Sequence, residues 1–262
     1  MSQLPVALHP YLDHPGPLPI AHRGGALEAP ENSLVAFQRA VALGFGWLET
    51  DVHATSDGVL VAFHDDRLDR LTDGTGVISE LPWSQVAQAC IDGSEPVPRL
   101  VDLLEALPAA RVNIDVKSPV AVGPLVELLN AHPELLTRVC VGSFSPRRLN
   151  AVRNGVTGSR LATSCAPSEV ARLLGGAQTR GLVWWSSPAV AAQVPERSNG
   201  IRIVSPRSVA YAHSRGLAVH VWTINDDADM HRLLDWGVDG IVTDRPILLR
   251  QVLKERGVWF GN

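Results

Sequence analysis

The sequence predicts a parallel (β/α)8 barrel, the TIM-barrel class, with a small insertion after its second strand. Eight short runs rich in apolar and β-branched residues recur along the 262 residues, and amphipathic segments separate them. Strand and helix alternating about eight times over roughly 250 residues is typical of this fold. An open doubly wound sheet is the alternative, but no glycine-rich dinucleotide motif follows the first run.

The predicted strands share a short apolar run that is bounded by polar or turn residues. They are residues 19–22, 47–52, 111–116, 138–143, 160–164, 201–205, 217–224 and 239–244. Residues 181–185, with the sequence GLVWW, compete with residues 201–205 for the sixth place in the barrel.

The segments between these strands carry signals that begin helices. Ser145 lies directly before a proline and Asp244 lies two residues before one, and we interpret both as N-cap residues. Residues 31–44, ENSLVAFQRAVALG, predict the first helix. The apolar residues that we expect to pack inward from it are Leu34, Phe37 and Val41.

The spacing is interrupted once, between the second and third strands, where about sixty residues separate the two. The excess falls at residues 65–98, which are rich in Asp, Gly, Ser and Pro. We interpret residues 1–262 as a single barrel domain and residues 65–98 as a small subdomain inserted into the loop after strand two.

Composition excludes several classes of protein. The net charge of -4 gives no basic surface for a nucleic acid. Three cysteines without paired spacing argue against a disulfide framework or a zinc site and fit a reducing compartment. The N-terminus is broken by prolines and does not resemble a signal peptide, and no apolar run is long enough to span a bilayer. We expect a cytoplasmic protein without stable membrane insertion.

Acidic residues two apart on predicted strands indicate a metal site. Alternation puts Glu49 and Asp51 on one face, with Cβ atoms about 7 Å apart, where they would repel each other unless a cation neutralised them. An isolated pair of this kind is more typical of an exposed strand end. Asp115 on the third strand adds a further carboxylate, and an oxygen-only set suits Mg²⁺, Ca²⁺ or Mn²⁺ better than zinc.

Other polar side chains follow apolar runs at predicted strand tips. His22 and His64 have the residue type for a general acid and a general base near neutral pH. Lys117 would hold an anionic oxygen, and Trp222 would form a wall for a small polyol. Taken alone, the lysine is an ordinary strand-end residue and the tryptophan a filler of the barrel end.

The residues after the first strand are Arg23, Gly24 and Gly25. A strand that only needs to end would not place a cation there, so we interpret Arg23 as a ligand for negative charge. We expect the two glycines to keep the loop low beside a substrate.

In these residues the chain resembles the glycerophosphodiester phosphodiesterase family over about residues 18–250. The motifs that carry the resemblance are AHRGG, ENS, LETDVHATSDGVLVAFHDDRLDRLTDGTG, PRLVDLLEAL, NIDVK, SFSPRRL, VHVWTIN and GVDGIVTDRP. The resemblance implies a barrel with an insertion after strand two. It also implies hydrolysis of glycerophosphodiesters to glycerol 3-phosphate and an alcohol, as part of glycerol and lipid metabolism.

The resemblance also implies a role for each candidate site residue. His22 and His64 would be the acid-base pair. One divalent metal ion, Mg²⁺ or Ca²⁺ or else Mn²⁺, would be bound by Glu49, Asp51 and Asp115. Phosphate oxygens would be held by Arg23 and Lys117, and Trp222 would line the glycerol pocket. We expect His22 to act as base and His64 as acid, with attack by the glycerol 2-hydroxyl or by water. Asp115 departs from the family, which commonly has glutamate there, and Ser33 replaces the usual threonine of the helix-opening motif.

Three alternatives stay open at this point. A lysophospholipase D or sphingomyelinase D type of enzyme would act on lipids and would show an exposed apolar rim. An aldolase would form a Schiff base through Lys117. A non-catalytic barrel would bind phosphodiesters without cleaving them.

Overall fold

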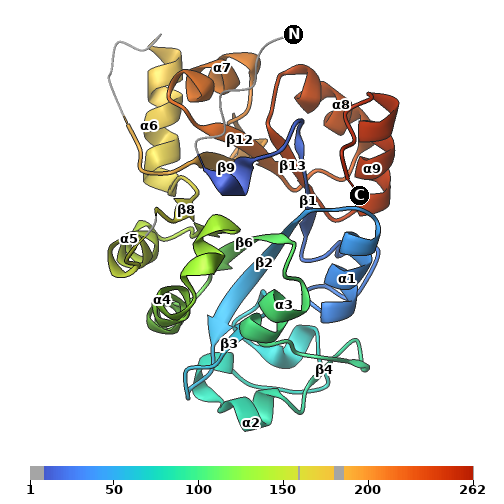
Figure 1. Cartoon of the computed structure of the whole chain (residues 1–262), viewed down its shortest axis with the longest axis vertical. Coiled ribbons are helices and arrows are strands. Elements are labelled where there is room, and N and C mark those ends of the chain that lie inside the picture. The colour runs from blue at the N-terminus through green and yellow to red at the C-terminus, as the bar shows by residue number, and fades with distance from the viewer. Residues whose placement is uncertain (1–8, 159, 180–185, 262) are drawn as a thin grey trace.

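The computed structural model describes residues 9–158, 160–179 and 186–261, in which parallel strands form a barrel surrounded by helices (Figure 1). The strands are β1 (Leu18–His22), β2 (Trp47–Ala54), β6 (Arg111–Val116), β7 (Val139–Gly142), β8 (Ala162–Thr163), β9 (Ala191–Pro195), β12 (Ala218–Trp222) and β13 (Gly240–Thr243). Their order is β8-β7-β6-β2-β1-β13-β12-β9, and a parallel bridge between Ser164 and Ala191 joins the two ends. The predicted (β/α)8 class is confirmed.

A helix follows each barrel strand along the chain, with the insertion placed before α3. The main helices are α1 (Leu34–Ala42), α3 (Leu100–Ala106), α4 (Val122–Ala131), α5 (Pro146–Gly155), α6 (Pro167–Gln178), α7 (Pro206–Ser214), α8 (Asp227–Asp235) and α9 (Pro246–Glu255). Short 3-10 helices η4 (Pro119–Ala121) and η5 (Pro133–Thr137) flank α4. The helices lie around the outside of the barrel in Figure 1.

The sixth barrel strand was predicted at the wrong place. It is β9, residues 191–195, rather than residues 201–205. Ile201 and Arg202 instead form β11 (Ile201–Arg202), which pairs antiparallel with β10 (Arg197–Ser198) in a small hairpin. The competing segment 181–185 lies outside the described residues. β9 contains Ala, Gln and Pro rather than a run of β-branched residues, so its sequence carries little strand signal.

Alternation along the strands separates an interior from an outer layer. Ile20 and Trp47 lie in an apolar cluster with Tyr11 of η1 (Pro10–Leu12), whereas Leu48 and Val52 belong to the main core. The indole N–H of Trp47 donates a hydrogen bond of 2.9 Å to the carbonyl of Tyr11. Apolar side chains therefore fill the amino-terminal end of the barrel, and the inward polar residues are left at the carboxyl ends of the strands.

The first helix is capped as its sequence predicts, but it turns a different face inward. The Ser33 hydroxyl accepts a hydrogen bond from the N–H of Ala36. Ala36, Phe37 and Ala40 are buried, whereas Val41 is exposed. The prediction that Val41 packs inward was wrong, because the small Ala36 and Ala40 face the barrel and Val41 lies off that face.

The insertion begins with β3 (Leu60–Ala62), which pairs antiparallel with β2. It continues through η2 (Leu68–Arg70), η3 (Ile78–Glu80), α2 (Trp83–Val86), β4 (Cys90–Ile91) and β5 (Glu95–Pro96). Its buried apolar residues, among them Phe63, Leu68 and Ile78, form a cluster separate from the barrel cores. The assignment of residues 65–98 as a subdomain stays a prediction.

Within the described ranges, no helix combines the length and the apolar character needed to cross a bilayer.

Candidate active site

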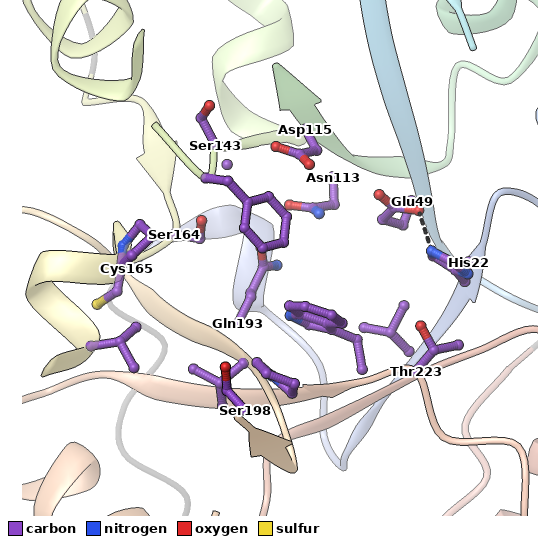
Figure 2. Close-up of a pocket in the computed structure, with 18 of the residues that line it drawn as sticks. His22, Glu49, Asn113, Asp115, Ser143, Ser164, Cys165, Gln193, Ser198 and Thr223 are labelled. Carbon is purple, nitrogen blue, oxygen red and sulfur yellow. Dashed lines mark ion pairs between the residues drawn. The ribbon is translucent and has the colours of Figure 1, made fainter. Parts of the chain in front are cut away.

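The residues singled out from the sequence line one cavity of about 480 Å³ at the carboxyl ends of the strands. Those residues are His22, Arg23, Glu49, Asp51, His64, Asp115, Lys117 and Trp222. Figure 2 shows Glu49, Asn113 and Asp115 close together on one side of the cavity, with His22 beside Glu49. Cys165 and Ser198 lie on the opposite side.

The strand register explains why these side chains meet. His22 of β1 is opposite Glu49 of β2. On the other side of β2, Glu49 is opposite Asn113 and Asp51 is opposite Asp115 of β6. Inward residues at equal height on neighbouring parallel strands form a layer, so two layers of polar side chains lie at the barrel mouth.

His22 is held by two carboxylates from other strands. Its Nδ1 lies 2.6 Å from Oδ1 of Asp244, and its Nε2 lies 3.7 Å from Oε2 of Glu49. Burial opposes a charge on the imidazole, but the charges of Glu49 and Asp244 outweigh burial and raise the pKa of His22 above its usual value. Asp244 was predicted to cap α9. It does not, because Arg245 occupies the N-cap position and the Asp244 carboxylate contacts His22 instead.

His64 follows the antiparallel strand β3 and reaches the same cavity from the insertion. Its Nδ1 lies 2.6 Å from Oδ1 of Asp65. Arg70 of η2 donates hydrogen bonds to both oxygens of Asp65, and these bonds lower the pKa of that carboxyl to about 2. Asp65 therefore stays ionised and accepts from the imidazole, which directs Nε2 of His64 away from Asp65.

Arg23 is anchored by carboxylates on both sides. Nη1 of Arg23 donates a hydrogen bond of 3.0 Å to Oε1 of Glu31. Nε of Arg23 lies 3.0 Å from Oδ2 of Asp51 in an ion pair, but its N–H is not directed at that oxygen. Glu31 also accepts from Arg70 at 2.9 Å. An unbroken chain of contacts thus runs from His64 through Asp65, Arg70 and Glu31 to Arg23.

Lys117 lies between two of the predicted metal ligands. Its Nζ is 2.8 Å from Oδ1 of Asp51 and 2.8 Å from Oδ2 of Asp115. Burial opposes the ammonium charge, but the two carboxylates outweigh it and raise the pKa of Lys117. Burial likewise opposes the charge on Asp51, while Lys117 and then Arg23 outweigh it and lower the pKa of that carboxyl.

The third predicted metal ligand, Glu49, is not paired with Lys117. Burial, and then repulsion from Asp51, raise the pKa of Glu49 to about 7. Oδ1 of Asp115 and Oδ1 of Asn113 are buried without hydrogen-bond partners. Unpartnered buried oxygens beside a destabilised carboxylate are a donor set that fits a hard divalent cation.

The metal-ligand prediction itself is not tested by this arrangement. Within residues 9–158, 160–179 and 186–261, no three His, Cys, Asp or Glu side chains are placed so that they could hold a metal ion together. Lys117 occupies the space between Asp51 and Asp115. Glu49, Asp51 and Asp115 as a ligand set therefore stay a prediction.

The two glycines after Arg23 have a packing role in addition to the one predicted for them. Gly24 and Gly25 have φ of +81° and +103°, and neither lines the cavity. A Cβ on Gly24 would lie 2.8 Å from Cβ of Ala36, and one on Gly25 would lie 2.6 Å from Pro246. The glycines leave room for the first turns of α1 and α9, and their role beside a substrate stays a prediction.

Trp222 ends β12 and forms part of a less polar side of the cavity. Its ring packs edge-on against Phe144 with 5.6 Å between centroids, and Nζ of Lys117 lies 5.5 Å from the Phe144 ring. Phe144 follows β7 and is 58% exposed. The tryptophan thus separates the charged side of the cavity from an apolar one.

Several residues of the site were missed or misinterpreted from the sequence. Asp244 ends the run DGIVTD, so the rule that functional residues follow barrel strands would have found it. Asn113 shares a strand face with Asp115, so the same alternation would have predicted its amide oxygen as a further candidate metal ligand. Arg70 and Phe144 lie within two of the motifs that carry the family resemblance, but only the fold shows how each of them reaches the site.

Comparison with known proteins gives consistent matches. The model of the glycerophosphoryl diester phosphodiesterase family matches residues 22–248. A probable glycerophosphodiester phosphodiesterase 2 of Mycobacterium tuberculosis is 41% identical over 96% of each chain. Lysophospholipase D GDPD1 of Mus musculus is 26% identical, with 89% of this chain and 85% of the relative covered. The crystal structure of a glycerophosphodiester phosphodiesterase from Agrobacterium tumefaciens has a TM-score of 0.71 and 26% identity, covering 89% of this chain and 98% of that one.

Proposed function

This chain belongs to the glycerophosphoryl diester phosphodiesterase family, and from this premise we propose that it hydrolyses glycerophosphodiesters to glycerol 3-phosphate and an alcohol with one divalent metal ion. One observation carries the proposal. Two imidazoles, three carboxylates and two cations, spread from residue 22 to residue 117, line a single cavity at the barrel mouth. That combination suits acid-base cleavage of an anionic ester.

Arg23 and Lys117 supply the positive charge for the phosphate. Arg23 is fixed by Glu31 and Asp51, so its guanidinium loses little freedom when it binds an oxygen. Lys117 is ionised because two carboxylates raise its pKa. The same ionisation argues against a Schiff-base aldolase, which needs a neutral amine.

His22 and His64 exchange protons through Nε2. Each uses Nδ1 to contact a carboxylate, Asp244 for His22 and Asp65 for His64, which sets the tautomer and leaves the other nitrogen toward the cavity. In our assignment His22 takes the proton of the attacking hydroxyl and His64 protonates the leaving alcohol.

Glu49, Asp51 and Asp115 would hold the divalent cation, with Asn113 beside them. The unpartnered oxygens of Asp115 and Asn113 and the burial of Glu49 support this assignment. A bound cation would neutralise charge on the phosphate and lower the pKa of a coordinated hydroxyl.

The metal requirement is tested with protein stripped by a chelator. We expect activity on glycerophosphocholine, glycerophosphoethanolamine and glycerophosphoglycerol to disappear and to return when Mg²⁺, Ca²⁺ or Mn²⁺ is added. Release of glycerol 3-phosphate is the measurement. Full activity in excess chelator would contradict the metal proposal, and substrate binding without product would favour a binding protein.

The acid-base assignment is tested by His22→Ala and His64→Ala. We expect each change to lower kcat by roughly 10² to 10⁴, the usual range for loss of an acid-base group. His132→Ala is the matched control, because that exposed imidazole forms an ion pair with Glu134 and does not line the cavity. Near-wild-type turnover in both site variants would end the assignment.

The alternative, hydrolysis of lysophospholipids, shares the chemistry at phosphorus with the proposed reaction. It needs in addition a place for an acyl chain. A relative named lysophospholipase D covers most of this chain's length, which makes the apolar side of the cavity the feature that decides between the two.

A further inference from the structure

The side of the cavity that faces the carboxylates is neutral, but it is not uniformly apolar. Val170 and Ile203 line it and also pack against the main core. Ser164 and Gln193 line the cavity beside them (Figure 2). Among the described residues of the cavity, those from 142 to 198 include no Asp, Glu, Lys, Arg or His. This side can therefore hydrogen-bond a ligand without attracting or repelling a charge.

Gln193 is held by a buried histidine on the neighbouring strand. Its Nε2 donates to Nδ1 of His220, 3.3 Å away, and the two residues are opposite each other in β9 and β12. His220 is fully buried, and burial lowers its pKa to about 4, so the imidazole is neutral near pH 7 and can accept at Nδ1. The amide nitrogen is thus committed to His220, and Oε1 of Gln193 is left for another partner.

That oxygen reaches from β9 toward the end of β7. It lies 3.7 Å from the point that a Cβ on Gly142 would occupy, and Oγ of Ser164 lies 2.9 Å from the same point. Gly142 is a strand residue without positive φ, so its conformation does not require glycine. The missing side chain instead leaves a space beside two oxygens. In the described part of the chain, neither Oε1 of Gln193 nor Oγ of Ser164 has a hydrogen-bond partner.

The position of this space selects one part of the substrate. Gly142 is opposite Asp115 in the pairing of β7 with β6, so the space adjoins the candidate metal ligands. The phosphate of a bound glycerophosphodiester is assigned to Arg23 and Lys117, and the 2-hydroxyl of its glycerol lies close to phosphorus along the substrate. The terminal hydroxyl is farthest from phosphorus, so it is the group that can extend past the carboxylates to Gln193.

We propose that Gln193 is a specificity-determining residue whose Oε1 accepts a hydrogen bond from the terminal hydroxyl of the substrate glycerol. Ser164 contributes its hydroxyl to the same space, and His220 is the positioning residue that fixes the Gln193 amide. This inference rests on the proposed phosphodiesterase activity. A substrate that lacks this hydroxyl, or carries an acyl group on it, has no proton to donate there. It leaves the partly buried amide oxygen of Gln193 unpaired, which is costly.

The first test compares two substrates that differ by one oxygen atom. Choline release is followed for glycerophosphocholine and for 2-hydroxypropyl phosphocholine of the same configuration, which lacks only the terminal hydroxyl. With the metal that supports activity, we expect kcat/KM to be roughly 10- to 100-fold higher for glycerophosphocholine, the range for a buried polar group left unpaired. Similar kcat/KM values for the two substrates would overturn the proposal.

The second test asks whether Gln193 recognises this hydroxyl. Gln193→Leu should lower the ratio of the two kcat/KM values to below about threefold, with the larger loss on glycerophosphocholine. Gln251→Leu is the matched control, because Gln251 is an exposed residue of α9 that hydrogen-bonds Glu255 and does not line the cavity. An unchanged ratio in Gln193→Leu, or an equal loss on both substrates, would overturn the role of Gln193.

The third test concerns the positioning residue. His220→Leu should lower the same ratio, because the Gln193 amide is then free to turn. His220→Asn should keep most of the ratio, since its amide oxygen lies near the position of Nδ1 and can accept from Gln193. Circular dichroism shows whether each variant is folded. If His220→Leu does not fold, the ratio in His220→Asn decides alone. Loss of the ratio in His220→Asn, or its full retention in folded His220→Leu, would overturn the role of His220.

The outcomes separate this inference from the proposed function. Failure of the wild-type protein to cleave glycerophosphocholine with Mg²⁺, Ca²⁺ or Mn²⁺ would overturn the phosphodiesterase activity itself. Each contrary result in the three tests above would leave that activity intact and would overturn only the recognition of the terminal hydroxyl.

Discussion

Asp244 shows how one contact between distant parts of the chain can orient a candidate catalytic side chain. Its Oδ1 contacts Nδ1 of His22, and its Oδ2 accepts a hydrogen bond of 2.8 Å from the amide of Asn225. Oδ1 of Asn225 accepts from the backbone N–H of Asp244 and from the hydroxyl of Thr243. Asn225 thus hydrogen-bonds both the carboxylate and the backbone N–H of Asp244. The carboxylate is therefore fixed in position and can orient the His22 imidazole.

We expect Asp244→Asn to lower kcat by roughly 10- to 100-fold with little change in KM, because the amide can present the wrong group to Nδ1 and disturb the tautomer of His22. Asp239→Asn is the control: Asp239 contacts His213 at 2.7 Å, but neither residue lines the cavity. Steady-state kinetics on glycerophosphocholine give the result. Equal kcat for Asp244→Asn and wild type would show that His22 does not depend on this contact.

At the scale of elements, the insertion contributes side chains to the candidate site. Arg70 of η2 contacts Asp65 next to His64 and also Glu31, which lies in the loop after β1. Among the residues that the structure describes, Arg67 on the same segment forms an ion pair with Asp69 alone. The side chains of Arg67 and Arg70 are both 50% exposed. The two arginines therefore differ in their ion-pair partners and not in their burial.

Arg70→Gln should lower kcat roughly tenfold, because a small displacement of His64 or Arg23 is costly at the transition state. The thermal midpoint should change by less than about 2 °C, since exposed ion pairs contribute little to stability. Arg67→Gln should change neither quantity. Kinetics and thermal unfolding of both variants provide the comparison, and an equal loss of kcat in both would contradict a specific role for Arg70.

At the scale of the whole molecule, a histidine outside the site makes stability depend on pH. Nε2 of His213, in α7, lies 2.7 Å from Oδ2 of Asp239, just before β13, and that oxygen also accepts from the N–H of Val219 in β12. The hydrogen bond to Asp239 raises the pKa of His213, although burial opposes it. The folded protein therefore binds this proton more tightly than the unfolded chain does.

The stabilisation is fully present below the unfolded pKa, near 6.5, and is lost as pH rises through the higher folded pKa. We therefore expect His213→Gln to reduce the free energy of unfolding more at pH 5.5 than at pH 8.5. Urea unfolding of both proteins at the two pH values measures the difference. A loss of the same size at both would mean that the imidazole contributes no proton-linked stability.

The sequence alone was sufficient for the barrel class and for eight of the residues that line its mouth. Glu49, Asp51 and Asp115 were found because alternation assigns each to an inward strand face. In parallel barrels the carboxyl ends of all strands meet, so residues near strand ends were expected to lie together. Strand six was misplaced, because β9 contains few of the residues that favour strands.

Local patterns therefore determined the fold class, the inward faces of the strands and the chemistry present at the mouth, since period and residue type are properties of short segments. Only the tertiary structure decided that Asp244 holds His22 across 222 residues of chain, that Lys117 lies between two acids, and that Gln193 of β9 meets the buried His220 of β12. These contacts depend on how distant strands close into a barrel, and no short segment contains that information.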